Sequence, residues 1–415
     1  MSERTDAPSR LARRLGLGDA VLVGLGSMLG AGVFAAFGPA AEAAGAGLLL
    51  GLAVAGAVAF ANAMSSARLA ALHPASGGTY VYAGARLGHL WGWLAGWSFV
   101  VGKLGSLAAM ALTLGIYAWP EAARPLAVAA VVGATALNLR GVEKTALATR
   151  AVVAIVLAVL AAVVVACLAG GEGSAEALST PWPGGAYGIL QAAGLLFFAF
   201  AGYARIATLG EEVRDPARTI PRAIPLALGM TLVVYASVGV AVLLALGPGG
   251  LAAADAPLAD AVKAAGAAGL EPVVRAGAAV AALGVLVSLL AGVSRTTFAM
   301  AAAGDLPRGL AAVHERFRVP HRAEVAVGAV VAVAVAFADL RDAIGFSSFA
   351  VLGYYALTNA SALTLRGRRV LPAFGLLGCV SLAVTLPLKS VVAGAVVVGA
   401  GLVVYGVRNV LRRAG

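Results

Sequence analysis

Long apolar stretches alternate with short polar connections along nearly the whole chain. A helix needs about 20 consecutive apolar residues to cross the hydrocarbon core of a bilayer. Runs that approach this length cover residues 18–41, 48–71, 90–117, 124–139, 148–169, 188–208, 223–246, 274–299, 323–338, 344–365, 370–387 and 390–407. The pattern predicts an all-α polytopic membrane protein with 12 transmembrane helices, and the even number places both termini on one side of the membrane.

The first apolar run is rich in glycine where a membrane helix is expected to be most regular. Four glycines fall within nine residues, from Gly24 to Gly32. Each glycine costs about 1 kcal/mol in a helix interior relative to alanine. Two explanations are open from this run alone. Gly26 and Gly30 have the GxxxG spacing that lets helices pack closely, or the backbone opens here, which a bilayer tolerates only where that backbone is buried in protein or lines a wet cavity.

A weaker interruption occurs in the sixth run, where Gly202 lies at mid-span among the aromatic residues of Phe197–Tyr203. Long connections follow the second and seventh runs, at residues 72–89 and 247–273, and the latter could form a short surface helix. These matching positions predict that helices 6–10 repeat helices 1–5 with inverted topology, and that helices 1 and 6 are discontinuous. Paired interruptions point to a substrate site at the membrane midplane, which favours the opened backbone in the first run.

The repeat divides the chain into four parts. They are a cytoplasmic N-terminal tail at 1–17, a first five-helix repeat at 18–169, an inverted second repeat at 188–366, and two trailing helices with a cytoplasmic C-terminus at 370–415.

The basic residues indicate the sidedness of these parts. The chain carries 30 lysines and arginines against 19 acids, a formal net charge of +11. With the N-terminus in the cytoplasm, the basic residues of the outer connections are Arg124, Lys263, Arg275, Arg341 and Lys389. Lys103 lies inside a span, and all the others lie on the inner side, which is a strong positive-inside bias. The surplus positive charge is therefore explained by the orientation of the chain in the membrane and by contact with an anionic inner leaflet. Nucleic-acid binding is not expected.

The composition narrows the setting further. The chain is 61% hydrophobic and 12% charged, whereas soluble domains carry about 25% charged residues. The high content of Ala, Gly and Arg is typical of proteins from GC-rich bacterial genomes. The expected location is therefore the bacterial cytoplasmic (inner) membrane. No removable signal peptide is evident. Cys167 and Cys379 lie in separate apolar runs and indicate no disulfide framework, and no metal or cofactor is expected.

Four short stretches then occur in a fixed order. They are Gly26–Phe34; Gly77–Tyr80 with Gly92–Trp97; Phe197–Tyr203 with Glu211–Pro216 and Ile220–Ile224; and Ser294–Arg295 with Gly304–Pro307. Their order and spacing resemble the amino acid–polyamine–organocation (APC) superfamily, near the bacterial permeases that look like cationic amino acid transporters. The resemblance implies the fold of the sodium-coupled leucine transporter, with five-plus-five inverted repeats, and transport of amino acids by alternating access.

The resemblance also implies where a substrate binds. Relatives hold the carboxylate and the amine of an amino acid at the two interruptions, because freed N–H groups favour an anion and freed carbonyls accept from an ammonium. The matching residues are Ser27, Met28, Gly30, Ala31, Gly32, Phe198, Ala199, Phe200 and Gly202. Polar wall groups are expected at Ser106 in the third run and at Ser347 or Ser348 in the tenth, although helix packing explains each serine equally well.

Lys103 lies about halfway along the third run. A charge at that depth costs several kcal/mol unless it is paired or hydrated, so it indicates function by default; snorkelling to an interface is the alternative. Some proton-coupled relatives carry a lysine in the fifth helix in place of a sodium ion, but Ala154–Leu157 lacks one. We therefore hypothesise that Lys103 supplies this charge or proton site. A coupling proton is then possible, and sodium is less favoured.

One further departure bears on specificity, and one further match bears on gating. Relatives that carry cations often have an acid just after the glycine–aromatic pair of helix 6, where this chain has Ala204. We expect neutral amino acids or a broad range, carried with proton coupling or by exchange, with cationic amino acids or polyamines as the alternative. By the resemblance, Glu211, Glu212 and Arg214 form an inner gate network, for which a solvated loop is the other explanation.

Other function classes are less favoured. A channel usually shows a repeated filter or a ring of like charges, and neither is visible here. An amino-acid-sensing receptor of the same fold also stays open. An enzyme is not expected, because the four histidines all fall in predicted inner loops and no catalytic motif occurs within a span.

Overall fold

The computed structural model describes residues 15–73, 77–141, 146–170, 178, 182, 184–207 and 213–414. Regular structure in these ranges is helical, apart from one isolated bridge between Leu15 and Val213. The α-helices are α1 (Leu17–Met28), α2 (Ala31–Ala35), α3 (Phe37–Ala44), α4 (Leu48–Leu72), α5 (Thr79–Leu87), α6 (His89–Ala118), α7 (Ala123–Leu139), α8 (Ala146–Ala169), α9 (Gly185–Phe200), α10 (Ala204–Ala207), α11 (Pro216–Ala253), α12 (Pro257–Ala264), α13 (Glu271–Ala302), α14 (His321–Phe337), α15 (Leu340–Leu363), α16 (Val370–Thr385) and α17 (Leu388–Ala414).

Nine helical segments within the described ranges are long and apolar enough to cross a membrane. α16 is apolar but shorter, α14 has 17 residues and α15 has 24. Each apolar run predicted from the sequence overlaps a helix. The chain is therefore an all-α, polytopic membrane protein. The 247–273 connection contains α12, the short helix that was expected there, and the 72–89 connection contains α5.

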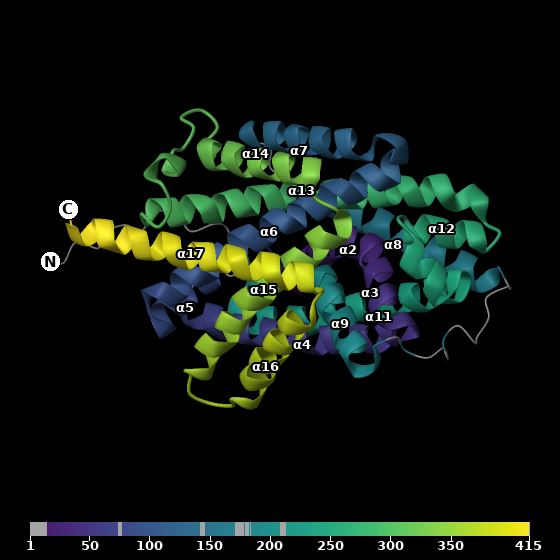
Figure 1. Cartoon of the computed structure of the whole chain (residues 1–415), viewed down its shortest axis with the longest axis horizontal. Coiled ribbons are helices and arrows are strands. Elements are labelled where there is room, and N and C mark those ends of the chain that lie inside the picture. The colour runs from purple at the N-terminus through teal and green to yellow at the C-terminus, as the bar shows by residue number, and fades with distance from the viewer. Residues whose placement is uncertain are drawn as a thin grey trace.

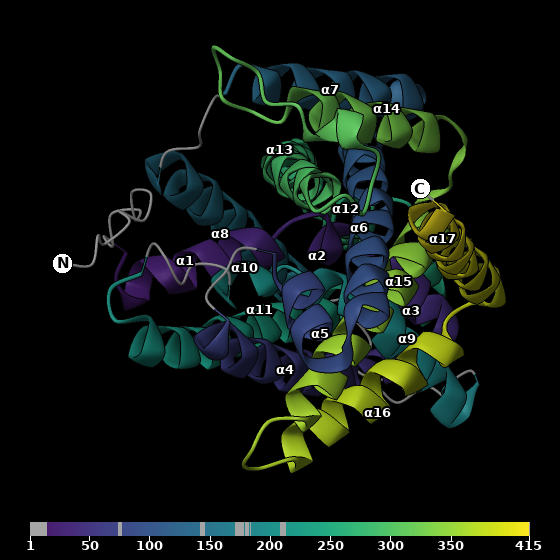
Figure 2. The same cartoon turned by 90° about the vertical axis from the view of Figure 1, so that its left-hand side faces the viewer.

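α6 lies at the centre of the bundle and packs against α13 and α15 (Figure 2). Of the residues in the apolar 18-residue segment of α6, 78% are buried, whereas only 17% are buried in the corresponding segment of α17. Small residues make this packing possible. A Cβ added to Gly102 would lie 2.9 Å from Ala350 Cβ, and one added to Gly105 would lie 2.9 Å from the Phe346 ring. Within a bilayer the hydrophobic effect does little to bring helices together, so membrane helices associate through close packing of this kind.

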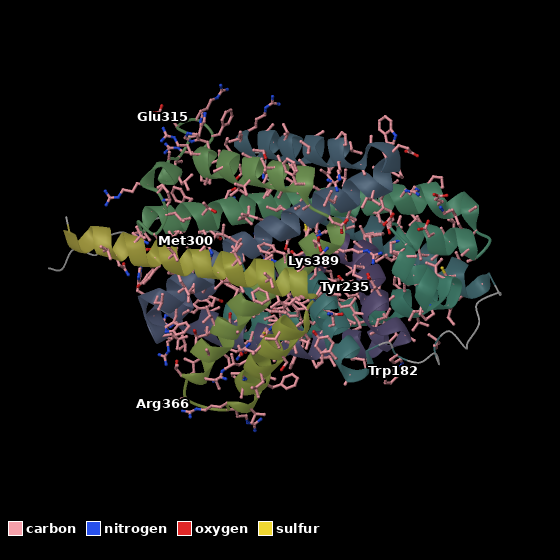
Figure 3. All side chains as sticks on the ribbon, in the orientation of Figure 1. Trp182, Tyr235, Met300, Glu315, Arg366 and Lys389 are labelled. Carbon is pink, nitrogen blue, oxygen red and sulfur yellow. The ribbon has the colours of Figure 1, made fainter. Side chains whose placement is uncertain are left out.

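The remaining helices form layers around α6. α7 and α14 lie side by side along one edge, over α13 and α6, and α4 and α16 lie on the opposite side (Figures 1 and 2). Glu315 and Arg366 mark connections at the end of the molecule where α17 finishes, and Trp182 lies at the opposite end (Figure 3). The two basic connections thus share one end, as the predicted topology requires.

Candidate functional site

The first apolar helix is interrupted at Leu29 and Gly30, between α1 and α2. Leu29 has φ −74° and ψ 61°, and Gly30 has φ −117° and ψ −147°. Neither pair of angles continues an α-helix. α2 runs almost directly into α3, because the intervening Ala36 keeps right-handed helical angles. The opened backbone predicted for this run is therefore present.

The glycines of the same run also allow close packing. A Cβ added to Gly26 would lie 3.0 Å from a Val153 methyl group, and one added to Gly30 would lie 2.7 Å from a Val285 methyl group. The two valines belong to α8 and α13. Both explanations of the glycine-rich run thus hold, because the glycines admit neighbouring helices around the break.

A turn at residues 201–203 separates α9 from α10. There the N–H groups of Tyr203 and Arg205 each donate three residues back along the chain, both at 3.1 Å. In an unbroken α-helix they would reach four residues back, to Ala199 O and Ala201 O. These two carbonyls lose their usual helical donors, so they are available to other partners.

The two interruptions touch each other. A Cβ added to Gly202 would lie 2.1 Å from Ser27 O, and one added to Gly32 would lie 2.5 Å from Ala199 Cα. Contacts under 3.0 Å are essentially never made by real Cβ atoms, so only glycine fits at either position without a shift of main-chain atoms. The missing side chains let the backbone of the first break lie directly against the backbone of the second.

Tyr235 of α11 links the same two breaks. Its single O–H proton is shared between Met28 O at 2.7 Å and Ala199 O at 3.0 Å, and the side chain is only 1% exposed. The Phe200 ring meets the Tyr235 ring edge-on, with centroids 5.2 Å apart. The sequence analysis missed this residue, since a tyrosine in an apolar run gives no signal beyond its hydroxyl. One turn earlier, Thr231 donates to Met28 Sδ at 3.7 Å.

Lys103 points toward the second break. Its side chain is buried, with 6% exposure, and Nζ lies 3.4 Å from Ala201 O. That oxygen is one of the two carbonyls that lack a helical donor. Among the described residues no carboxylate forms an ion pair with Lys103. The ammonium therefore contacts the helix break rather than snorkelling to a membrane interface.

Two of the predicted polar wall groups, Ser106 and Ser347, meet between α6 and α15. Ser106 Oγ and Ser347 Oγ are 2.6 Å apart, and Ser348 Oγ is buried with no hydrogen-bond partner among the described residues. Phe198 on α9 is also buried. Within the part of the chain that the structure describes, no group of three His, Cys, Asp or Glu side chains is arranged to hold a metal ion.

Polar contacts tie down the start of α1. Arg150 of α8 donates to Asp19 at 2.5 Å, and Arg214 N donates to Leu15 O at 2.9 Å. Arg214 thus contacts this region through its main chain. The other two members of the predicted inner gate network, Glu211 and Glu212, lie outside the described residues.

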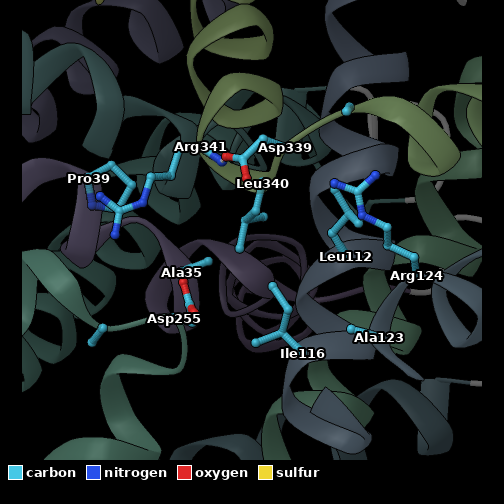
Figure 4. Close-up of a pocket in the computed structure, with 12 residues that line it drawn as sticks. Ala35, Pro39, Leu112, Ile116, Ala123, Arg124, Asp255, Asp339, Leu340 and Arg341 are labelled. Atoms are coloured by element: carbon cyan, nitrogen blue, oxygen red, sulfur yellow. The ribbon is translucent and has the colours of Figure 1, made fainter. Parts of the chain in front are cut away.

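A cavity of 130 Å³ lies at the opposite end of α2, beside Ala35. Four charged residues and several apolar ones surround it: Arg124, Asp255, Asp339, Arg341, Pro39, Leu112, Ile116 and Leu340 (Figure 4). Arg341 forms an ion pair with Glu42 at the end of α3 and donates to Ala252 O at 2.6 Å. These bonds join α15, α3 and the end of α11 above the cavity.

Comparison with known proteins places this geometry in context. A family model described as "Amino acid permease" matches residues 15–408. The chain is 64% identical to an uncharacterized transporter of Mycobacterium tuberculosis, over 98% of this chain and 94% of that protein.

More distant similarity extends to proteins with named substrates. The chain is 26% identical to the branched-chain amino acid permease BcaP of Bacillus subtilis, over 97% of this chain and 94% of the relative. It is 29% identical to the vacuolar cationic amino acid transporter 2 of Arabidopsis thaliana, over 86% of this chain and 60% of that protein.

Proposed function

Because the chain belongs to the amino acid permease family, we propose that it is a secondary active transporter that moves amino acids across the bacterial cytoplasmic membrane by alternating access. The family match also confirms the resemblance to APC transporters. The observation that carries the mechanism is the backbone contact between the two helix breaks. It brings Gly32, near the start of α2, against Ala199, whose carbonyl lacks a helical donor, and both residues are buried.

The proposed architecture has 12 transmembrane helices, with inverted repeats at 18–169 and 188–366 and both termini in the cytoplasm. The breaks support the repeat, since each falls in the first helix of its half. α5 and α12 occupy the equivalent connections after the second helix of each half.

In the proposed binding mode, the substrate carboxylate accepts from the N–H groups of Ala31 and Gly32, which begin α2 and so lack partners within the helix. Gly30 N already donates to Met28 O at 2.7 Å, so it is not a free donor for the substrate. Gly30 instead forms part of the break in the helix. The substrate ammonium donates to Ala199 O, while Ala201 O keeps its contact with the Lys103 ammonium. Phe198, Ser106 and Ser347 form the wall around the side chain, and Arg214 belongs to the inner gate.

We propose neutral amino acids as the substrates. The Lys103 ammonium lies at Ala201 O without a carboxylate partner among the described residues, and its charge disfavours a substrate whose side chain carries a further positive charge. The relationship to a branched-chain amino acid permease supports this assignment. Cationic amino acids are the second candidate, because plant relatives are named for them.

Labelled leucine and labelled arginine, offered to proteoliposomes of the purified protein, test this function. We expect leucine to enter, and unlabelled leucine inside to accelerate entry of the label. Such counterflow separates alternating access from a channel. Arginine uptake without leucine uptake would replace the first substrate class by the second, and failure of all common amino acids to enter or exchange would refute the function.

Lys103 is proposed to couple transport to protons. Replacing Lys103 by Met removes the charge while keeping the side chain long and apolar. We expect this variant to lose the increase of leucine uptake that an inward proton gradient produces, while counterflow at equal pH persists. Lys389→Met, at the start of α17, is the matched control and should retain the gradient response. An unchanged response in Lys103→Met would exclude a coupling role.

A further inference from the structure

We propose that Tyr235 is a resident hydrogen-bond donor that lets the unloaded transporter close, so that this protein catalyses net uptake rather than exchange alone. The inference rests on the proposed transport function and concerns the half of the cycle in which no substrate is bound. Tyr235 is a positioning residue in this role, since it acts on the two helix breaks.

The need for such a donor follows from the breaks themselves. A carbonyl buried in a membrane protein without a hydrogen bond is costly, because no water reaches it. In the loaded state, the proposed substrate ammonium would satisfy carbonyls at the breaks. When the substrate leaves, Ala199 O has no helical N–H to take its place. Closing around an empty site then requires donors from elsewhere in the chain.

The structure contains such donors at these positions. The Tyr235 hydroxyl bonds to Met28 O on one break and to Ala199 O on the other. The Lys103 ammonium lies at Ala201 O. Both side chains come from other helices, α11 and α6, and the non-helical angles in α11 fall at Gly247, well beyond Tyr235. The breaks are in backbone contact, and the carbonyls of Met28, Ala199 and Ala201 are contacted by the protein's own groups.

This arrangement has a consequence for the mode of transport. A carrier that closes only when loaded is confined to exchange, because the empty site cannot cross the membrane. A carrier whose empty breaks are held together by internal donors completes the return step without substrate. The substrate ammonium and the Tyr235 hydroxyl therefore alternate at Ala199 O during the cycle.

The test compares net uptake and exchange in one proteoliposome preparation. Tyr235→Phe removes only the hydroxyl and keeps the ring against Phe200. We expect net uptake into leucine-free vesicles to fall by about fivefold or more, the effect of one unmet buried hydrogen bond. Exchange against internal leucine should stay within about twofold of the wild-type rate, because the loaded state supplies its own donor.

Thr231→Val is the matched control. Thr231 lies one turn away on α11 and also contacts Met28, but its hydroxyl meets the thioether sulfur rather than a carbonyl. This variant should lower net uptake and exchange to the same extent, if at all. The ratio of net uptake to exchange is compared between Tyr235→Phe and Thr231→Val. If it changes equally in both variants, the effect comes from packing and the proposal is overturned.

Thermal unfolding in detergent gives a second measurement that does not depend on transport. In Tyr235→Phe the empty protein has lost a donor and the loaded protein has not, so leucine should raise the melting temperature more in the variant than in the wild type. An equal shift, together with an unchanged ratio of fluxes, rejects the role of Tyr235. Wild-type protein that neither takes up nor exchanges any amino acid refutes the transport function instead.

Discussion

Gly202 and Gly32 each occupy a place where a methyl group would collide with main-chain atoms of the opposing break. Main-chain atoms move less readily than side-chain ends, so the collisions are not relieved by a change of rotamer. These two positions therefore set how closely the breaks approach. Other glycines of the chain, such as Gly353 on α15, have no neighbouring atom within 4 Å of an added Cβ.

The variant Gly202→Ala tests this point at the scale of one residue. Overpacking of this kind costs about 1–3 kcal/mol, which is about a 5- to 150-fold loss of the closed arrangement. We expect leucine counterflow to fall accordingly. Gly353→Ala adds the same methyl group into open space and should leave counterflow unchanged. Equal rates in the two variants would show that the breaks do not need this contact.

At the scale of helices, α3 and α15 are joined beside the cavity at Ala35. The Glu42–Arg341 pair connects their adjoining ends, and the bond from Arg341 to Ala252 O adds the end of α11. The Glu42 side chain is 65% exposed, so solvent screens the pair and its strength is modest. If transport proceeds as proposed, a weak latch suits a helix end that opens during the cycle.

Chemical labelling measures this latch. With cysteine at Ala35, a membrane-impermeant maleimide reports access to the cavity, and the native Cys167 and Cys379 are both buried. An exposed pair is worth at most about 1 kcal/mol, so Glu42→Gln should raise the labelling rate by up to about fivefold. Glu121→Gln, placed in the same region but outside the pair, is the control. If the labelling rate is the same in Glu42→Gln and Glu121→Gln, the Glu42–Arg341 pair does not act as a latch.

At the scale of the whole molecule, Asp305 joins elements that are distant in sequence. Its carboxylate accepts from Tyr80 of α5 at 2.6 Å and from Arg408 of α17 at 2.6 Å, and it lies 3.2 Å from His89 at the start of α6. The Asp305 side chain is 1% exposed. Few residues of α17 are buried. The Asp305 cluster therefore helps to hold α17 against α5 and α6.

Asp305→Asn should therefore destabilise the whole fold. Removing one partner of a buried ion pair costs about 3–5 kcal/mol, and Arg408, whose side chain is 18% exposed, would keep its charge in this largely buried position. A clear fall in the melting temperature of the detergent-solubilised protein is the expected result. Asp260→Asn breaks a surface pair with Lys263 and should change the melting temperature little. A similar small change for both would mean that the cluster contributes no anchoring.

Local patterns were enough to predict much of the fold and part of the site. Apolar length marks a spanning helix whatever surrounds it, so every predicted run overlaps a helix. Glycine weakens a helix wherever it stands, and both interruptions occur where Gly30 and Gly202 indicated them. Tyr235 could not be found this way, because its partners Met28 and Ala199 are far from it along the chain.

The sequence by itself determined the helices, their breaks and the placement of basic residues, because these follow from the cost of exposing polar groups or charges to a bilayer. Only the tertiary structure decided how the breaks are used. It brings Gly202 against Ser27, turns Lys103 toward Ala201 O, and gives one tyrosine hydroxyl to both broken helices. Such contacts depend on which helices pack together, and a hydrogen bond between distant residues leaves no periodic trace in the chain.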